Sequence, residues 1–168
     1  MLFLKSRYDE MILGGQMLLT IVGNAWESNS PDDKSCTVWE LLGNTLYDMV
    51  LEGFIEEPKL DEFNLPYYAP AEEEVKKAVE AEVSFDIREL ETYKMDWDSS
   101  ASSEIGLQGK SVAGSIRAIA ESLFASHFAD VNMDDLFERY AKKVTEYFEV
   151  VKGQCTTMLI SMTKELEK

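Results

Sequence analysis

The sequence is poor in the residues that build disulfide frameworks, metal clusters and membrane spans. Its two cysteines, Cys36 and Cys155, form no CxxC pair, which favours free thiols in a reducing compartment. One histidine, His127, excludes a multi-histidine metal cluster. No stretch approaches the roughly 18 apolar residues of a membrane span, and charged residues interrupt the apolar start of the chain. These absences predict a soluble, cytoplasmic protein that does not bind a membrane.

Basic residues are also scarce. Lys and Arg number 16 against 32 Asp and Glu, so the net charge is 16 − 32 = −16. Such a chain repels phosphate backbones, which argues against nucleic acid as a partner. The 168 residues are 45% hydrophobic with a mean hydropathy of −0.21, as expected of a folded protein with one domain or half of a larger one.

Common catalytic and cofactor motifs are missing. The chain has no GxGxxG, no GxxxxGK[ST] and no GxSxG, so it carries no phosphate-binding loop or nucleophile elbow of its own. His127 closes an apolar helical stretch, a position that favours a structural histidine over a catalytic base. The acidic run 72–74 favours a solvated helix start over a catalytic carboxylate pair. No catalytic and no cofactor-binding residue is predicted.

Hydrophobic periodicity predicts an α/β protein with three strands and about five helices. A helix over 1–12 ends at Gly14 and Gly15, and the apolar run after it predicts a strand covered on both faces. The second strand, 85–97, would pack one face through Phe85, Ile87, Tyr93, Met95 and Trp97. Residues 156–162 predict the last strand.

Helices are predicted between the strands. A capping box from Thr37 to Glu40 opens a helix that Gly53 ends, and Pro70 fits the first turn of another. Residues 24–36 and 98–110 are predicted loops. Two long helices follow, the second with Asn132 as N-cap. Their predicted buried stripes are Val112, Ile116, Ile119 and Leu123 in the first, and Met133, Leu136, Tyr140, Val144, Tyr147 and Val151 in the second.

Two features could carry chemistry. The loop 59–68 holds Asp61 and Asn64, whose oxygens suit Mg²⁺ or Ca²⁺, beside Phe63 and Pro66, which indicate a packed helix connection as the alternative. Trp39 lies in the first turn of its helix, where a flat side chain either joins the core or stacks on an aromatic ligand. Both alternatives stay open from composition alone.

Long stretches of the chain resemble the SABATH carboxyl methyltransferases of plants. The resemblance runs in order through GGQMLLTIVG, the segment from VWELLGNTLYDMV to EVSFDI, SVAGSIRAIAESLFASHF, MDDLFERYAKKV and TTMLISMTK. That family transfers a methyl group from S-adenosylmethionine to small acids such as salicylate, benzoate, jasmonate, indole-acetate or farnesoate. The resemblance covers only the family's C-terminal half, so most cofactor-binding residues would lie outside this chain.

The resemblance implies a fold and a set of site residues. The fold is the C-terminal part of a class I, Rossmann-like methyltransferase sheet with a helical substrate cap, here a single partial domain over 1–168. The sheet part comprises 1–23, 85–97 and 156–164, and residues 37–83 and 110–150 are largely cap helices. Asp61, the Phe63 carbonyl and Asn64 match the family's DxFN magnesium site. The implied substrate pocket is lined by Val22, Val38, Trp39, Ile116, Ile119 and Cys155.

The family's topology also predicts the strand order. The strand at 16–22 would be the fifth, that at 85–97 the sixth, and that at 156–163 an antiparallel seventh inserted between them. The fifth strand would expose an edge that invites aggregation or a partner. We therefore expect either the substrate-pocket and magnesium half of a methyltransferase, or an inactive fragment that pairs with a full-length relative. A homodimer is a further possible assembly.

Overall fold

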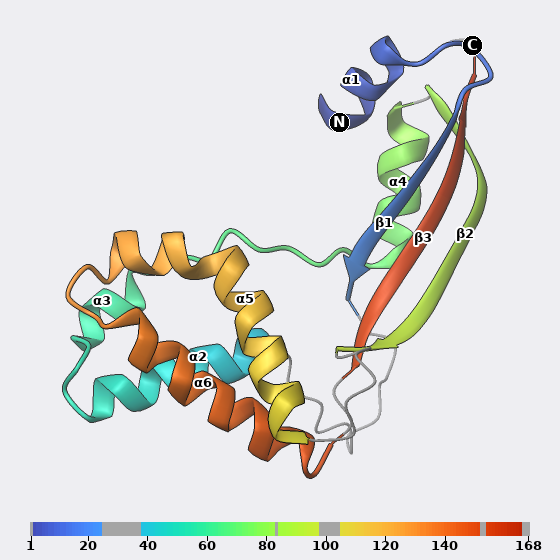
Figure 1. Cartoon of the computed structure of the whole chain (residues 1–168). Helices are drawn as coiled ribbons and strands as arrows, with labels where there is room; N and C mark the ends of the chain where they lie inside the picture. The colour runs from blue at the N-terminus through green and yellow to red at the C-terminus, as the bar shows by residue number, and fades with distance from the viewer. Residues whose placement is uncertain (1, 25–37, 83, 98–104, 152–153, 166–168) are drawn as a thin grey trace. The chain divides into compact units, whose positions relative to one another are not determined.

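The computed structural model describes residues 2–24, 38–82, 84–97, 105–151 and 154–165. It divides the chain into two compact units (Figure 1). The sheet unit comprises residues 1–30, 68–95 and 154–168, and the helical unit comprises residues 31–67 and 96–153. The expected loop at 24–36, Cys36 and the Thr37 cap lie almost wholly outside the described residues.

The sheet unit contains three strands in the order β1-β3-β2. These are β1 (Gln16–Gly23), β2 (Phe85–Asp96) and β3 (Gln154–Lys164). Strand β3 runs antiparallel to β1, with Leu19 opposite Ile160. The backbone N–H of Glu165 donates to the Ser84 carbonyl over 3.2 Å, so the end of β3 lies beside the start of β2. The predicted order, with the last strand inserted antiparallel between the other two, is confirmed.

Two helices cover one face of this sheet, α1 (Leu2–Glu10) and α4 (Glu72–Glu82). Leu4 of α1 and Val75 and Val79 of α4 are buried in one cluster with the β3 side chains Met158, Ile160 and Met162. Val75 and Val79 are four residues apart and share a helix face. Residues 37–83 are predicted to belong largely to the cap, whereas α4 packs on the sheet because this apolar pair faces it.

Strand β1 differs from the expectation that both of its faces are covered. Its side chains alternate between packed and exposed positions, and Leu18 and Val22 are 64% and 40% exposed. The alternation arises because α1 and α4 cover one face only, on the side of Leu19 and Ile21. Strand β1 is also an outer strand of the described sheet, as the topology from the resemblance requires.

The predicted packed face of β2 holds for only part of the strand. Phe85 and Ile87 lie in the cluster beneath the helices, and so does Leu90, which has the opposite parity. Arg88 donates to Thr163, which has the parity of the β3 face opposite α1 and α4, while the Thr92 hydroxyl donates to Glu72 of α4. The parity therefore switches between residues 88 and 90. This switch leaves Tyr93 and Met95 exposed, at 43% and 48%.

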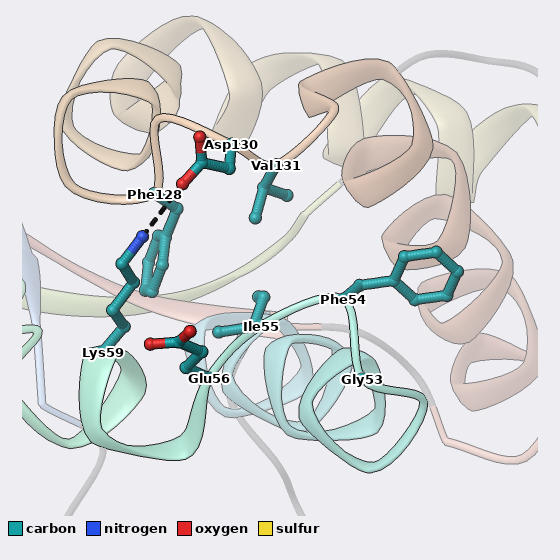
Figure 2. A pocket seen from close by; sticks show the side chains of 8 residues that line it. All are labelled: Gly53, Phe54, Ile55, Glu56, Lys59, Phe128, Asp130 and Val131. Atoms are coloured by element: carbon teal, nitrogen blue, oxygen red, sulfur yellow. Dashed lines mark hydrogen bonds and ion pairs between the residues drawn. The ribbon is translucent and has the colours of Figure 1, made fainter.

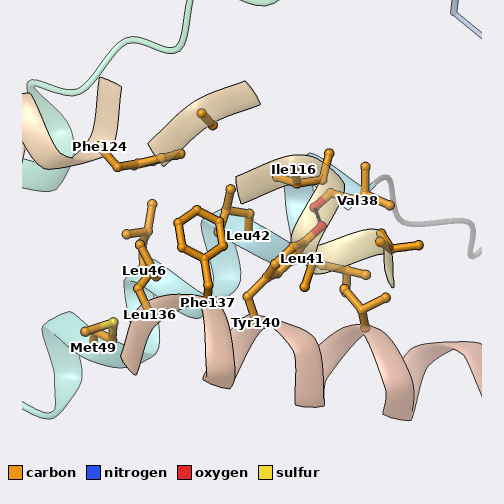
Figure 3. Packing of buried hydrophobic residues seen from close by; sticks show 14 of the residues in the cluster. Val38, Leu41, Leu42, Leu46, Met49, Ile116, Phe124, Leu136, Phe137 and Tyr140 are labelled. Atoms are coloured by element: carbon orange, nitrogen blue, oxygen red, sulfur yellow. Dashed lines mark hydrogen bonds between the residues drawn. The ribbon is translucent and has the colours of Figure 1, made fainter. Parts of the chain in front are cut away.

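The helical unit consists of α2 (Val38–Leu51), α3 (Glu57–Asp61), α5 (Ile105–His127) and α6 (Met133–Phe148) among its described residues. Side chains of α2, α5 and α6 interdigitate in its core (Figure 3). Tyr140 is fully buried there, and its hydroxyl donates to the Val38 carbonyl over 3.0 Å. Asn132 caps α6 as predicted, accepting from the Asp134 N–H over 2.9 Å. Gly53 adopts a positive φ of 82° just after α2 ends.

Helix α5 begins earlier and is rotated from the prediction. It starts at Ile105, so the predicted loop at 98–110 is wrong from that residue on, and residues 98–104 lie outside the described part. Val112 and Ile116 are buried as expected, but Ile119 and Leu123 are 64% and 39% exposed. The buried stripe instead continues through Ala120, Phe124 and Phe128. It advances by four residues each time and passes through a small alanine that a search for large apolar side chains overlooks.

No described helix is long and apolar enough to cross a membrane. The exposed large apolar side chains of the described residues are distributed over α1, β1, α2, β2, α5 and the segments that connect the elements.

Candidate functional site

The loop that follows α3 is held in place by its apolar side chains. The Phe63 ring lies 4.8 Å from the Phe124 ring, 5.1 Å from the His127 ring and 5.2 Å from the Phe128 ring, measured between centroids. Leu65 also packs against the helical core. The loop is therefore a packed helix connection, one of the two alternatives predicted for it.

His127 links the end of α5 to α3. Its Nε2 lies 2.7 Å from the Lys59 carbonyl oxygen, so the Nε2–H donates to that carbonyl. The ring also contacts Phe128 edge-on, with centroids 4.7 Å apart. These contacts use the polar edge and the faces of the imidazole in packing, which supports the predicted structural role for His127.

The two side chains predicted to bind magnesium lie on the outside of this loop. Asp61 and Asn64 are exposed, and neither side chain forms a hydrogen bond or ion pair within the described residues. A carboxylate, an amide oxygen and the Phe63 carbonyl are hard oxygen donors of the kind Mg²⁺ prefers. The described residues hold no group of three or more His, Cys, Asp or Glu placed to bind a metal. The donor set fits magnesium in kind, and further ligands or water would be needed to complete it.

A small cavity of about 180 Å³ lies next to α3 (Figure 2). Its apolar lining includes Ile55 and Phe128, and the Lys59 ammonium forms an ion pair with Asp130 over 3.1 Å at its edge. The carboxylate of Glu56 also lies at the cavity in Figure 2. The cavity lies between the turn after α2 and the turn between α5 and α6. None of the predicted site residues lines it.

Four of the predicted pocket residues belong to the helical unit. Val38 and Ile116 are 2% and 1% exposed within its core, where Figure 3 shows them close together. Trp39 is partly buried against that core, and Ile119 lies on the exposed side of α5. The structure thus brings Val38 and Ile116 together as core residues and leaves Ile119 apart from them.

The other two predicted pocket residues lie on the face of the sheet opposite α1 and α4. Val22 of β1 is opposite Thr157 of β3, and the Thr157 hydroxyl lies 3.9 Å from the Cys155 thiol. Val22 and Cys155 therefore project from the same face, close together. Leu18 lies on this face as well, four residues before Val22.

A pair of side chains fixes the start of α4. The Tyr68 hydroxyl donates to Glu74 over 2.6 Å, and the Ala71 N–H donates to the same carboxylate over 2.7 Å. The hydrogen bond from Tyr68 lowers the pKa of Glu74, with a further contribution from Ala71. The same hydrogen bond raises the pKa of Tyr68. Glu74 is thus a helix-capping carboxylate, consistent with the structural role predicted for the acidic run.

Two features of the site were missed from the sequence. The short helix α3 begins inside a predicted connection, and Pro58 in its first turn was the available signal. The second is the contact between Trp39 and Tyr67, whose ring centroids lie 4.9 Å apart at an angle of 42°. No spacing rule connects residues 28 positions apart.

Comparisons with known proteins agree with this fold. The family model described as SAM dependent carboxyl methyltransferase matches residues 1–165. The chain is 38% identical to probable jasmonic acid carboxyl methyltransferase 1 of Theobroma cacao, over 98% of this chain and 46% of the relative. It is 40% identical to S-adenosyl-L-methionine:benzoic acid/salicylic acid carboxyl methyltransferase 3 of Petunia hybrida, over 96% of this chain and 44% of the relative.

A solved structure is similar as well. Loganic acid methyltransferase with SAH matches with a TM-score of 0.75 and 28% identity, over 98% of this chain and 46% of that one. The chain spans about half the length of the curated relatives it matches.

Proposed function

The chain belongs to the SAM dependent carboxyl methyltransferase family, and we propose that it supplies the substrate-pocket and magnesium-site half of an enzyme that methylates a small carboxylic acid. The observation that supports this most strongly is the match of the family model to residues 1–165, nearly the whole chain. We further propose a cytoplasmic location, from the two cysteines without framework spacing.

The proposed reaction needs little general acid–base catalysis from this chain. A carboxylic acid with a pKa of about 4 is already ionised at neutral pH, so its oxygen needs no general base to act as nucleophile. S-adenosylmethionine, when bound, supplies the activated methyl group, and we assign none of this chain's residues to holding it. What remains is to align the carboxylate and to exclude water, which apolar walls accomplish. We propose that Val22, Val38, Trp39, Ile116, Ile119 and Cys155 form or support those walls.

A chimaera tests this function directly. We expect residues 1–165, joined to the remaining part of the Theobroma cacao relative in place of its matched region, to form a methyl ester from jasmonate, benzoate or salicylate. Trp39→Ala in that chimaera should reduce kcat/KM by about tenfold, because a large aromatic contact contributes roughly 1–3 kcal/mol. Formation of labelled ester from methyl-labelled cofactor is the measurement.

The matched control for this substitution lies on the same helix. Tyr47 is an aromatic residue of α2 that is 51% exposed, so Tyr47→Ala should leave kcat/KM unchanged. Equal losses in both variants would show a general effect of aromatic truncation on α2 and contradict a pocket role for Trp39. A folded chimaera that esterifies none of the three acids would overturn the proposed function.

We also propose that Asp61, the Phe63 carbonyl and Asn64 contribute to a magnesium site. Support comes from two exposed oxygen-bearing side chains that lack partners within the described residues. With Mg²⁺ at tenfold excess over its Kd, stability should rise by about 1.4 kcal/mol in the parent, and Asp61→Ala should abolish the gain. Thermal unfolding of the chimaera with Mg²⁺ and with a chelator measures it.

Glu62 provides the control for the magnesium site. It is an exposed carboxylate next to Asp61, and Glu62→Ala removes the same charge without removing a proposed ligand. A magnesium response that survives Asp61→Ala, or that Glu62→Ala abolishes equally, would show general charge screening instead of a site.

One observation favours a second function: β1 is an outer strand of the described sheet, and its residue Leu18 is exposed. Such an edge can pair with another strand. An inactive chain could therefore act as an interaction module that binds a full-length relative or a second copy of itself. A folded but inactive chimaera, together with co-elution of the chain with a full-length relative in size-exclusion chromatography, would favour this function.

A further inference from the structure

The indole N–H of Trp39 is buried and has no acceptor among the described residues. Its Nε1 atom is inaccessible to solvent and makes no hydrogen bond in the structure's described part. Arg7 Nε is in the same condition, but that guanidinium is paired with Glu10 through another nitrogen. Indole has one donor only, so Trp39 lacks any compensation for its desolvation. Buried polar groups of this kind are rare in folded proteins and call for a partner.

The Tyr67 ring packs against the indole of Trp39. The two rings lie 4.9 Å apart at 42°, and Tyr67 is 41% exposed. The turn after Pro66 is tight, with the Tyr67 N–H donating to the Leu65 carbonyl over 2.8 Å. Within the described residues the Tyr67 hydroxyl has no hydrogen-bond partner, so its side chain can rotate away without losing one. Phe63 and Leu65 keep the loop backbone in place meanwhile.

We propose that Trp39 donates this hydrogen bond to an uncharged acceptor oxygen of the acid substrate, after the Tyr67 side chain moves off the indole. The inference rests on the proposed function. In that reaction the substrate carboxylate must face the methyl donor. We assign none of this chain's residues to binding that donor. The part of the acid that faces Trp39 is therefore its other end.

Trp39 then determines specificity for one class of acid. An acid with a keto or hydroxyl oxygen at its far end accepts the hydrogen bond of the indole N–H. An otherwise identical acid with a hydrocarbon group at that end leaves the N–H buried without a partner. Sites built around a buried donor discriminate strongly against ligands that lack the acceptor. Because a neutral hydrogen bond is modest in net terms, we expect a preference of about tenfold from this one group.

Two probes of nearly the same shape test the inference on the 168-residue chain. They are 4-acetylbenzoate and 4-isopropenylbenzoate, which differ by C=O against C=CH₂. The chain has three tryptophans, and with ¹⁵N-labelled indoles the Trp39→Phe variant identifies the Trp39 signal by its loss. We expect 4-acetylbenzoate to bind about tenfold more tightly than 4-isopropenylbenzoate and to move the Trp39 indole proton downfield. Trp39→Phe should remove the preference while the hydrocarbon probe binds as before.

Tyr67→Ala provides the second variant. It takes away the side chain that packs against the indole, so binding of 4-acetylbenzoate should strengthen while the preference over the hydrocarbon remains. Equal binding of the two probes, a Trp39 signal that neither probe moves, or no binding of either probe would each overturn the inference. Methyl transfer by the chimaera is measured separately. An active chimaera with no probe preference thus refutes the role of Trp39 alone, and an inactive chimaera refutes the proposed function.

Discussion

Phe124→Ala is expected to lower the free energy of unfolding of the helical unit by about 3–5 kcal/mol. Phe124 is 1% exposed in the last turn of α5, and its ring contacts Phe63 on the loop after α3 as well as Phe128. Removing the ring leaves a cavity and takes away the surface on which Phe63 rests. Urea unfolding followed by far-ultraviolet circular dichroism measures the change.

The neighbouring residue supplies the control. Leu123 is 39% exposed on the same helix, so Leu123→Ala should change stability by no more than about 0.5 kcal/mol. The sequence pattern predicts the opposite ranking, because it places Leu123 in the buried stripe. A larger loss for Leu123→Ala than for Phe124→Ala would mean that the described rotation of α5 is incorrect.

The same substitution bears on the proposed magnesium site. Asp61 and Asn64 flank Phe63, whose ring is fixed by Phe124, His127 and Phe128. Ligands on a loop bind a metal well only when the loop is already ordered, because ordering it on binding costs conformational entropy. Phe124→Ala should therefore weaken the magnesium response even though Phe124 is not a ligand.

The sequence predicted the order of the strands more reliably than the packing of their faces. The order β1-β3-β2 followed from the family topology, which is a property of the whole chain. The face of β2 depends on a local parity switch between Arg88 and Leu90, and one extra residue in a strand leaves no compositional trace. For that reason the alternation in the sequence places Tyr93 and Met95 on the packed face, whereas both are exposed.

The candidate site shows the same limit. Asp61 and Asn64 could be selected from residue chemistry, since carboxylate and amide oxygens are recognisable in a sequence. The buried N–H of Trp39 could not, because it depends on how the folded chain packs around the indole, and Tyr67 reaches that ring only through the turn at Pro66. The predicted buried stripe of α5 is wrong for a third reason. Ala120 is completely buried, but its small side chain adds little to a hydrophobic pattern.

Gly109→Ala is expected to destabilise the helical unit by about 1–3 kcal/mol, although alanine favours helix by about 1 kcal/mol over glycine. Gly109 lies in the second turn of α5 where that helix meets α6. A Cβ there would be 2.9 Å from both the Ala141 carbonyl oxygen and the Thr145 backbone nitrogen, and closer still to the Thr145 hydroxyl. Backbone atoms cannot rotate away, so α5 and α6 would have to separate.

A second glycine in the same helix isolates this steric effect. Gly114 is exposed and a Cβ added to it would meet nothing within 4 Å, so Gly114→Ala should stabilise the unit by about 0.5–1 kcal/mol. The two substitutions make the same chemical change in the same helix, so opposite signs in urea unfolding can come only from the contact with α6. If Gly109→Ala were stabilising as well, α5 and α6 would not approach as closely as the structure describes, and the core that holds Val38 and Ile116 would be looser than Figure 3 shows.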